Sequence, residues 1–216
     1  MMMEDERMAA FIQSLAKGSP PFLEELEQNA RENNVPVIRS EMQNLLRFLL
    51  TAFRPMHILE VGTAVGYSAL FMCEYAPEGC RITTIEKYEK RITEALANFR
   101  KYNKAEQITL LKGDAADILG QLDGTYDMIF MDAAKGQYIH FLPDSLRLLK
   151  TGGLLVTDNC LQEGEILESR FAVTRRNRTI HARMREYLYE ITHHPLLETC
   201  ILPIGDGVAL SAKKQT

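Results

Sequence analysis

The stretch H-I-L-E-V-G-T-A-V-G-Y-S at residues 57–68 decides the fold, because an apolar run ends there in an acid and a glycine-rich turn. From this point on, short apolar runs alternate with helical segments. Such alternation predicts a parallel sheet covered by helices on both faces. The predicted strands are His57–Val61, Arg81–Ile85, Ile108–Leu111, Tyr126–Met131 and Gly153–Thr157, and the predicted helices lie near Ser68–Tyr75, Tyr88–Tyr102, Ala115–Leu122 and Phe141–Leu149.

Both ends of the chain add elements to this alternating core. The first fifty residues predict three helices, the first of which carries Met8, Phe11, Ile12 and Leu15 on one face. After residue 180 one more helix precedes two strands, Thr199–Pro203 and Val208–Ala212, joined by an Asp-Gly turn that predicts a hairpin. We therefore expect one α/β domain over residues 1–216, with a Rossmann-like, mostly parallel seven-stranded sheet and a C-terminal antiparallel hairpin. Residues 1–54 form a helical cover, and residues 55–216 form the core.

The composition is that of a globular protein. The chain has 216 residues, of which 46% are hydrophobic and 25% charged, which excludes disordered and fibrous classes. The four cysteines lie far apart and show no metal-ligand spacing, as in reduced proteins of the cytoplasm, where we expect this chain. No apolar run approaches the 18 or so residues of a membrane span. The net charge of −4 argues, by itself, against general nucleic-acid binding.

Three acids lie at the carboxyl ends of three successive predicted strands, where ligands bind in open α/β sheets. Glu60 precedes Gly62 in a turn that lacks the dinucleotide pattern G-x-G-x-x-G, so a cationic ligand suits it better than a pyrophosphate. Glu86 can accept hydrogen bonds from both hydroxyls of a ribose, and Asp114 from an adenine amine. A nucleoside with a positive centre and no phosphate fits all three, which predicts S-adenosylmethionine. The alternative is that these are ordinary loop acids and turn glycines.

Two further predicted strands end in oxygen-bearing side chains. Asp132 follows Tyr126–Met131, and Asp158 and Asn159 follow Gly153–Thr157. Two carboxylates and an amide oxygen suit Mg²⁺ or another hard divalent cation and do not suit zinc. Each residue alone could equally cap a helix or shape a turn. Lys135 lies three residues beyond Asp132, where a nearby cation would lower its pKa toward that of a usable base, although it could also be a solvated loop lysine.

In combination these motifs resemble the cation-dependent O-methyltransferases related to catechol and caffeoyl-CoA O-methyltransferases. The resemblance covers E-V-G-T-A-V-G-Y-S, I-E-K, G-D-A, M-D-A-A-K, D-N and the ending L-P-I-G-D-G. It implies the class I methyltransferase fold, a homodimer, and N-terminal helices over the active site. It implies Lys135 as the base and Asp132, Asp158 and Asn159 as the metal ligands. The methyl donor would be bound by Ile38, Glu60, Gly62, Ser68, Glu86, Asp114 and Ala115, with Asp132 beside it.

An arginine-rich segment bears on the acceptor. Residues 169–185 hold six arginines and no acid, so this segment carries +6 and the remaining residues −10 within the total of −4. Such a cluster predicts phosphate binding and stacking on exposed bases. The alternative is a solvated helix with Ile180, Met184, Leu188 and Ile191 as its buried stripe. The predicted RNA-binding residues are Arg170, Arg175, Arg176, Arg178, Arg183 and Arg185.

Two acceptor classes offer the adjacent oxygens that a held cation can chelate. Catechol-like or CoA-linked phenols form one class. The other is 5-hydroxyuridine, and in the arginine-rich segment and the ending I-L-P-I-G-D-G-V-A-L-S the chain looks more like the bacterial branch that methylates this base at the tRNA wobble position, giving 5-methoxyuridine. The tRNA anticodon loop is thus the expected partner. A non-catalytic nucleotide- or RNA-binding module would keep the fold without a metal, and a dehydrogenase lacks its glycine motif here.

Overall fold

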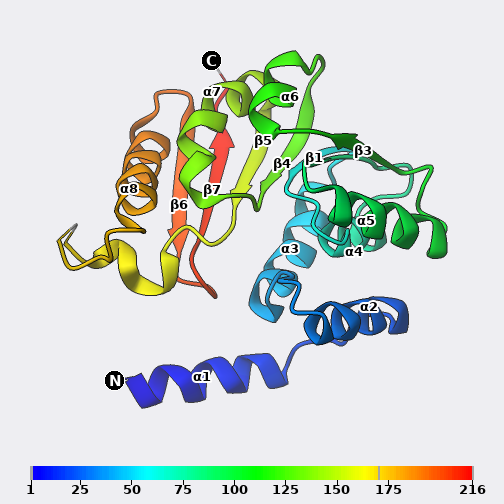
Figure 1. The fold of residues 1–216 in the computed structure, drawn as a ribbon, viewed down its shortest axis with the longest axis horizontal. Coiled ribbons are helices and arrows are strands. Elements are labelled where there is room, and N and C mark those ends of the chain that lie inside the picture. The colour runs from blue at the N-terminus through cyan, green and yellow to red at the C-terminus, as the bar shows by residue number, and fades with distance from the viewer. Residues whose placement is uncertain (1, 170, 216) are drawn as a thin grey trace.

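Seven strands form one sheet in the order β3-β2-β1-β4-β5-β7-β6 in the computed structural model, which describes residues 2–169 and 171–215 (Figure 1). Strands β1 to β5 run parallel, and β7 lies antiparallel to both β5 and β6. This confirms the Rossmann-like sheet and its C-terminal hairpin. The strands are β1 (His57–Val61), β2 (Arg81–Glu86), β3 (Ile108–Lys112), β4 (Tyr126–Met131), β5 (Leu149–Thr157), β6 (Leu197–Leu202) and β7 (Val208–Lys213).

The chain reverses its direction of travel across the sheet at β1. It moves outward from β1 through β2 to β3, and then returns to place β4 on the other side of β1. The loops that follow β1 and β4 therefore leave in opposite directions. A crevice opens at such a reversal, at the carboxyl ends of the strands.

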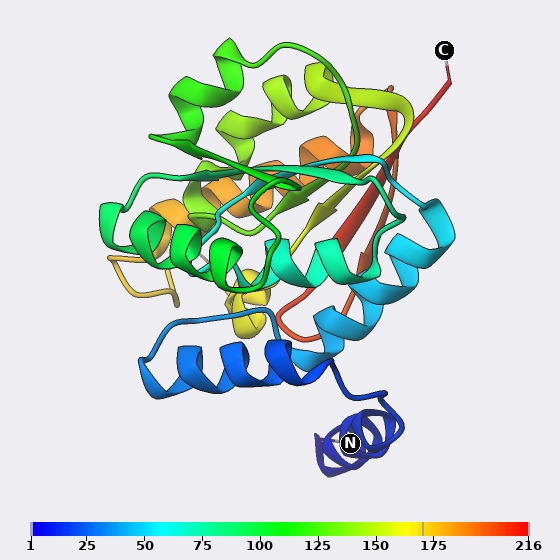
Figure 2. The same ribbon diagram turned by 90° about the vertical axis from the view of Figure 1, so that its right-hand side faces the viewer.

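Helices cover both faces because alternate residues of each strand point to opposite sides. Ile58 belongs to one buried cluster, with α2 to α5, whereas Leu59 belongs to the other, with α6 to α8. Figure 2 shows the green α5 on one side of the sheet and the yellow-green α7 on the other. The helices are α1 (Met2–Ser14), α2 (Pro21–Glu32), α3 (Ser40–Phe53), α4 (Tyr67–Tyr75), α5 (Glu89–Lys101), α6 (Ala115–Gln121), α7 (Tyr138–Leu148) and α8 (Arg178–His193), with short 3-10 turns η1 (Lys135–Gln137) and η2 (Gln162–Leu167).

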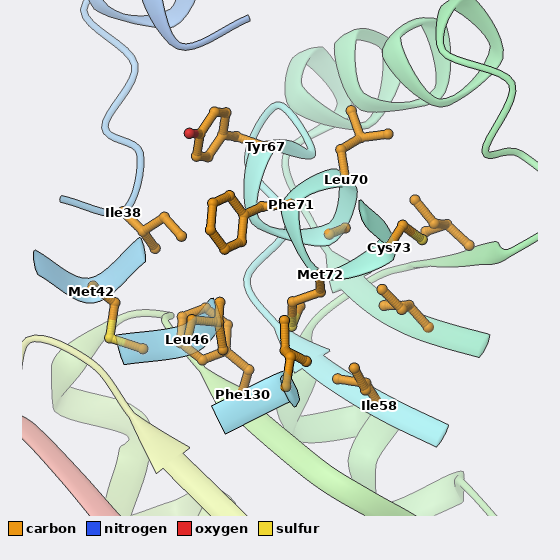
Figure 3. Close-up of a cluster of buried hydrophobic side chains, with 14 of the residues drawn as sticks. Ile38, Met42, Leu46, Ile58, Tyr67, Leu70, Phe71, Met72, Cys73 and Phe130 are labelled. Atoms are coloured by element: carbon orange, nitrogen blue, oxygen red, sulfur yellow. The ribbon is translucent and has the colours of Figure 1, made fainter. Parts of the chain in front are cut away.

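The N-terminal part of the chain is joined to the core through α3. In Figure 3, Met42 and Leu46 of α3 extend toward Phe71 of α4, and Ile58 and Phe130 come from the strands beneath. All five side chains are buried. This packing fixes the segment before α3, which includes Ile38, against the ends of the strands.

Helix α1 projects from the rest of the molecule in both views (Figures 1 and 2). The face that its spacing predicts carries Met8, Phe11, Ile12 and Leu15, and these side chains are 57–67% exposed. The helix prediction is confirmed, but no part of the described chain covers its apolar face.

The last parallel strand is longer than the sequence predicts. Gly152 and Gly153 suggest that the strand begins at Gly153, whereas β5 begins at Leu149. Gly152 has φ +78°, and the pairing with β4 shifts register between Tyr126 and Met128. Glycine within a strand commonly marks such an irregularity, so the strand continues through it.

Other expectations concern cysteines and membranes. Cys73, Cys80 and Cys160 are buried free thiols, and Cys200 is exposed and free, which agrees with the reduced state expected. No helix within residues 2–169 and 171–215 has the length and apolar character needed to cross a bilayer.

Candidate functional site

A cavity of about 780 Å³ lies at the carboxyl ends of the parallel strands. The hairpin residues 204–206 and the segment 36–39 also contribute to its wall. Most of the predicted site residues line it, whereas Glu60 and Lys135 do not. The predicted residues that line the cavity are Ile38, Gly62, Ser68, Glu86, Asp114, Ala115, Asp132, Asp158 and Asn159.

The turn after β1 has room only for glycine at its start. Gly62 has φ +109°, and a Cβ built there would lie 2.1 Å from the backbone oxygen of Asp132. The amides of Gly62 and Thr63 both donate to the carbonyl of Ile85, at 3.1 and 3.2 Å. The ends of β1, β2 and β4 are thus held in close contact, which leaves the cavity edge free of side-chain bulk.

Glu60 lies behind the cavity wall and has no exposed surface. Thr84 Oγ1 donates to Glu60 Oε2 at 2.5 Å, and the Thr63 and Thr84 hydroxyls are 2.6 Å apart. Burial raises the pKa of Glu60 to about 8, against hydrogen bonds from Ser68 and Thr84 that lower it. Thr63 and Ser68 themselves line the cavity. Hydrogen bonds through the hydroxyl groups of Thr84 and Thr63 therefore connect the Glu60 carboxyl group to the cavity wall.

Glu86 and Asp114 are held by the backbone at the ends of β2 and β3. Glu86 Oε1 accepts from the amides of Lys87 and Tyr88, and its Oε2 accepts from the amide of Ala64, each at 2.9 Å. Asp114 caps α6 by accepting from the Ala116 amide at 3.0 Å, which lowers its pKa, as does Lys87 at 3.1 Å. Both carboxylates are oriented acceptors on the cavity wall, as ribose hydroxyls and an adenine amine require.

Asp132, Asp158 and Asn159 meet at the ends of β4 and β5. Asn159 Nδ2 donates to Asp132 Oδ1 at 3.3 Å, and the Asn159 amide donates to Asp158 Oδ1 at 2.7 Å. Burial raises the pKa of Asp132 to about 6 and that of Asp158 to about 7, and the negative charge of Asp132 contributes to the second shift. The arrangement therefore places two mutually repelling carboxylates, the half-buried Asp132 and the buried Asp158, in the cavity wall.

This trio fits a hard divalent cation by its chemistry. A cation would neutralise the repelling pair, and oxygen donors are those that Mg²⁺ prefers. Asn159 now turns its amide nitrogen toward Asp132, so its oxygen would have to turn inward to act as a ligand. Within the described ranges, no group of three or more His, Cys, Asp and Glu side chains is arranged to hold a metal. The set therefore depends on the Asn159 amide, with open positions for water or substrate.

Lys135 forms an ion pair with Asp206, a residue that the Asp-Gly motif predicts only as part of a turn. Its Nζ donates to Asp206 Oδ2 at 2.7 Å. Asp206 belongs to the turn between β6 and β7 and lines the cavity. The signal that could have revealed it is the direction of β6. This strand runs in the same direction as β1 to β5, so the turn that follows it lies at the same sheet edge as the carboxyl ends of those strands.

The arginine-rich segment begins beyond η2 and extends into α8. Arg175 and Arg176 are exposed. Arg178, Arg183 and Arg185 donate to the carbonyls of Val173, Gly136 and Ile166 at 3.3, 3.2 and 3.0 Å, and Arg170 lies outside the described residues.

The alternative interpretation of this segment, a helix with a buried apolar stripe, is partly correct. Met184 and Ile191 of α8 are fully buried, as a structural stripe requires, whereas Ile180 is 37% exposed. Arg183 ties α8 to η1, the turn that carries Lys135, so the segment adjoins the site.

Comparison with known proteins agrees with this geometry. Residues 13–214 match the family model described as O-methyltransferase. The chain is 31% identical over 169 residues to a catechol O-methyltransferase of Niastella koreensis, covering 76% of this chain and 71% of that protein. It is 28% identical over 203 residues to caffeoyl-CoA O-methyltransferase 2 of Populus trichocarpa, covering 88% and 81%.

A solved structure extends the likeness to three dimensions. The SAH-bound methyltransferase PaMTH1 of Podospora anserina is 25% identical, with a TM-score of 0.88 over 99% of this chain and 96% of that one. The cavity at the strand ends, the family match and these relatives lead to one conclusion: the chain belongs to the O-methyltransferase family and is an S-adenosylmethionine-dependent O-methyltransferase.

Proposed function

We propose that the chain methylates one of two adjacent oxygens of its acceptor, with a divalent cation, Mg²⁺ or another hard ion, held by Asp132, Asp158 and Asn159. The observation that carries this proposal is the pair formed by the half-buried Asp132 and the buried Asp158 with its amide neighbour, in the wall of the cavity that Glu86 and Asp114 also line. When bound, such a cation would lower the pKa of an acceptor hydroxyl.

The chain's own residues would orient the methyl donor and take the proton. Glu86 and Asp114 would bind the ribose and the adenine, and Ile38, Gly62, Ser68 and Ala115 would complete the donor site. Lys135, in its neutral form, would accept the hydroxyl proton at Nζ. The acceptor oxygen then forms a bond to the methyl carbon while the carbon–sulfur bond breaks, which leaves S-adenosylhomocysteine.

For the acceptor, we propose 5-hydroxyuridine at the tRNA wobble position. The support is the arginine-rich segment: Arg175 and Arg176 are exposed, whereas Arg178, Arg183 and Arg185 donate to backbone carbonyls. The segment adjoins the turn that carries Lys135, so phosphates bound there would lie near the site.

A small phenol is the second candidate, and the comparisons favour it more directly. The relatives are named for catechol and caffeoyl-CoA, and the likeness extends over most of this chain. These acceptors would use the same cation and base. The arginines would then serve the fold, or the phosphates of a CoA-linked phenol.

One assay decides between the acceptors. Purified protein receives S-adenosylmethionine with Mg²⁺ and either catechol, caffeoyl-CoA or tRNA bearing 5-hydroxyuridine, and the methylated products are identified by mass spectrometry. Formation of 5-methoxyuridine supports the tRNA proposal, whereas methylation of a phenol alone overturns it. Methyl transfer that continues in the presence of EDTA overturns the proposed role of the divalent cation.

We also propose that the protein is a homodimer in which α1 packs against a second copy. The support is the exposed apolar face formed by Met8, Phe11 and Ile12 of α1 together with Leu15, the first residue after it. Light scattering after size-exclusion chromatography should give the mass of a dimer, and Phe11→Glu should shift it toward a monomer. A wild-type monomer would overturn this proposal.

A further inference from the structure

We propose that Asp206 is a positioning residue for Lys135: its carboxylate holds the Lys135 ammonium beside the ends of β4 and β5. This inference rests on the proposed function of Lys135 as the base. The residue comes from the turn of the C-terminal hairpin, to which neither the motifs nor the comparisons assign a role.

The contact between Lys135 and Asp206 is short, and its two side chains differ strongly in burial. Lys135 Nζ and Asp206 Oδ2 are 2.7 Å apart, and their side chains are 34% and 3% exposed, respectively. A carboxylate that is almost completely removed from water needs a counter-charge. An ordinary surface pair, in contrast, holds its partners only weakly. The Lys135 side chain is therefore fixed by its partner rather than free in solvent.

Backbone contacts fix Asp206 in turn. Its carbonyl accepts from the Leu161 amide, and the carbonyl of Gly207 accepts from the Cys160 amide, both at 2.9 Å. Gly207 has φ +85°, and a Cβ there would lie 2.2 Å from Leu161 Cγ. The hairpin turn is thus docked on the residues that directly follow Asn159. Asp206 joins this segment to the loop after β4 through its side chain.

The surrounding charges explain why Lys135 needs such a partner. Its positive charge lowers the pKa of both Asp132 and Asp158, and the negative charge of Asp206 raises that of Asp158. Lys135 thus lies within the field of three carboxylates. Without Asp206, the remaining attraction would draw the ammonium toward Asp132 and Asp158, the residues proposed to hold the cation.

Chemical labelling tests the contact without any acceptor. The full-length protein and its Asp206→Asn variant are acetylated with an N-hydroxysuccinimide ester, and the rate at each lysine is followed by peptide mass spectrometry. We expect Lys135 to react about tenfold faster in the variant, since Nζ would lose the charge-assisted hydrogen bond that holds it against Asp206 and would become more accessible to the reagent. Lys150, which pairs with Asp127 at 2.7 Å, serves as the internal reference. An unchanged ratio of the two rates would overturn the inference.

A double-mutant cycle tests the consequence for catalysis, using whichever acceptor the wild type methylates. Asp206→Asn should lower kcat by about 10- to 100-fold, as loss of an orienting partner does, with little change in KM. In a Lys135→Met background the same substitution should have almost no further effect. Equal losses in both backgrounds would show that Asp206 acts independently, and would overturn the inference.

One control variant and a comparison of the two readouts separate the possible failures. Asp206→Glu keeps the carboxylate and should restore slow labelling of Lys135. If it labels as fast as Asp206→Asn, the inference is wrong. Asp206→Ala takes the place of the asparagine variant in the cycle should that variant not fold. If the wild type methylates none of the acceptors, the proposed function fails, whereas the labelling still decides the Lys135–Asp206 contact.

Discussion

Thr84 donates its hydroxyl hydrogen to Glu60 across adjacent strands, at 2.5 Å, in a place where neither residue has any exposed surface. The two residues are register partners in the β1–β2 pair. Within the part of the chain that the structure describes, no hydrogen bond reaches Glu60 Oε1. Burial favours the neutral form of this acid and outweighs the hydrogen bond from Thr84, which favours the anion, so the pKa rises to about 8.

We predict that Glu60 makes the protein lose stability as the pH rises. Its pKa of about 8 in the folded state exceeds the ordinary 4.5, so the folded state binds more protons between these values. The stabilisation is complete below pH 4.5 and is lost as the pH approaches 8, at up to roughly 1.4 kcal/mol per pH unit. Glu60→Gln, which stays neutral, should remove this dependence.

Urea denaturation at several pH values, with EDTA present, measures the effect. The informative quantity is the difference in the free energy of unfolding between the wild type and Glu60→Gln. The raised pKa values of Asp132 and Asp158 also make stability depend on pH, but they do so in both proteins. Glu89→Gln, at an exposed position on α5, is the matched control. Parallel pH curves for wild type and Glu60→Gln would contradict the prediction.

A second prediction concerns the close contact between the ends of β1 and β4. Gly62→Ala should destabilise the fold by about 3 kcal/mol or more, because its Cβ would lie 2.1 Å from the Asp132 backbone oxygen at a φ of +109°. Gly124→Ala provides the control: it has a similar φ of +97° but nothing within 4 Å of the added carbon. Thermal melts should separate the two variants clearly. Equal losses of stability in the two variants would mean that backbone strain, and not the contact with Asp132, causes the destabilisation.

The meeting of Asp132, Asp158 and Asn159 could be predicted because it follows from topology. These residues end two strands that an α/β sheet places next to each other, and parallel strands bring their carboxyl ends to one edge. Glu86 and Asp114 reach the cavity by the same rule. The position of Glu60 behind the wall could not be predicted so easily, because it depends on which face of β1 its side chain takes among packed neighbours.

The contact that Asp206 makes with Lys135 could not be predicted from the sequence, for a different reason. An Asp-Gly pair predicts a turn from local conformation alone, and nothing local tells what the carboxylate touches. Its contact with Lys135 spans 71 positions and depends on β7 lying next to β5. Likewise, the spacing on α1 predicts a helix with an apolar face, but what covers that face is a property of tertiary or quaternary packing.

A third prediction follows from the repelling pair at the ends of β4 and β5. Asp158→Ala should abolish methyl transfer while leaving the affinity for S-adenosylmethionine largely intact. Mg²⁺ should raise the thermal stability of the wild type, by about 2.7 kcal/mol at a hundred times its dissociation constant, and should have no such effect on the variant. Calorimetry and thermal melts provide these readouts. Asp123→Ala, at an exposed position, is the control, and stabilisation of Asp158→Ala by Mg²⁺ would exclude Asp158 as a ligand.

The last prediction concerns Arg175 and Arg176, the exposed arginines of the segment before α8. Replacing both with alanine should weaken binding of tRNA and flatten its dependence on salt. Each lost phosphate contact should remove about one unit from the slope of log K against log salt, so the pair should remove about two. The control removes two exposed charges elsewhere, at Lys90 and Arg100 on α5. Fluorescence anisotropy from low to moderate salt measures both slopes. If the two double variants behave alike, the segment makes no specific phosphate contact, and its remaining function is the anchoring that Arg178, Arg183 and Arg185 already provide.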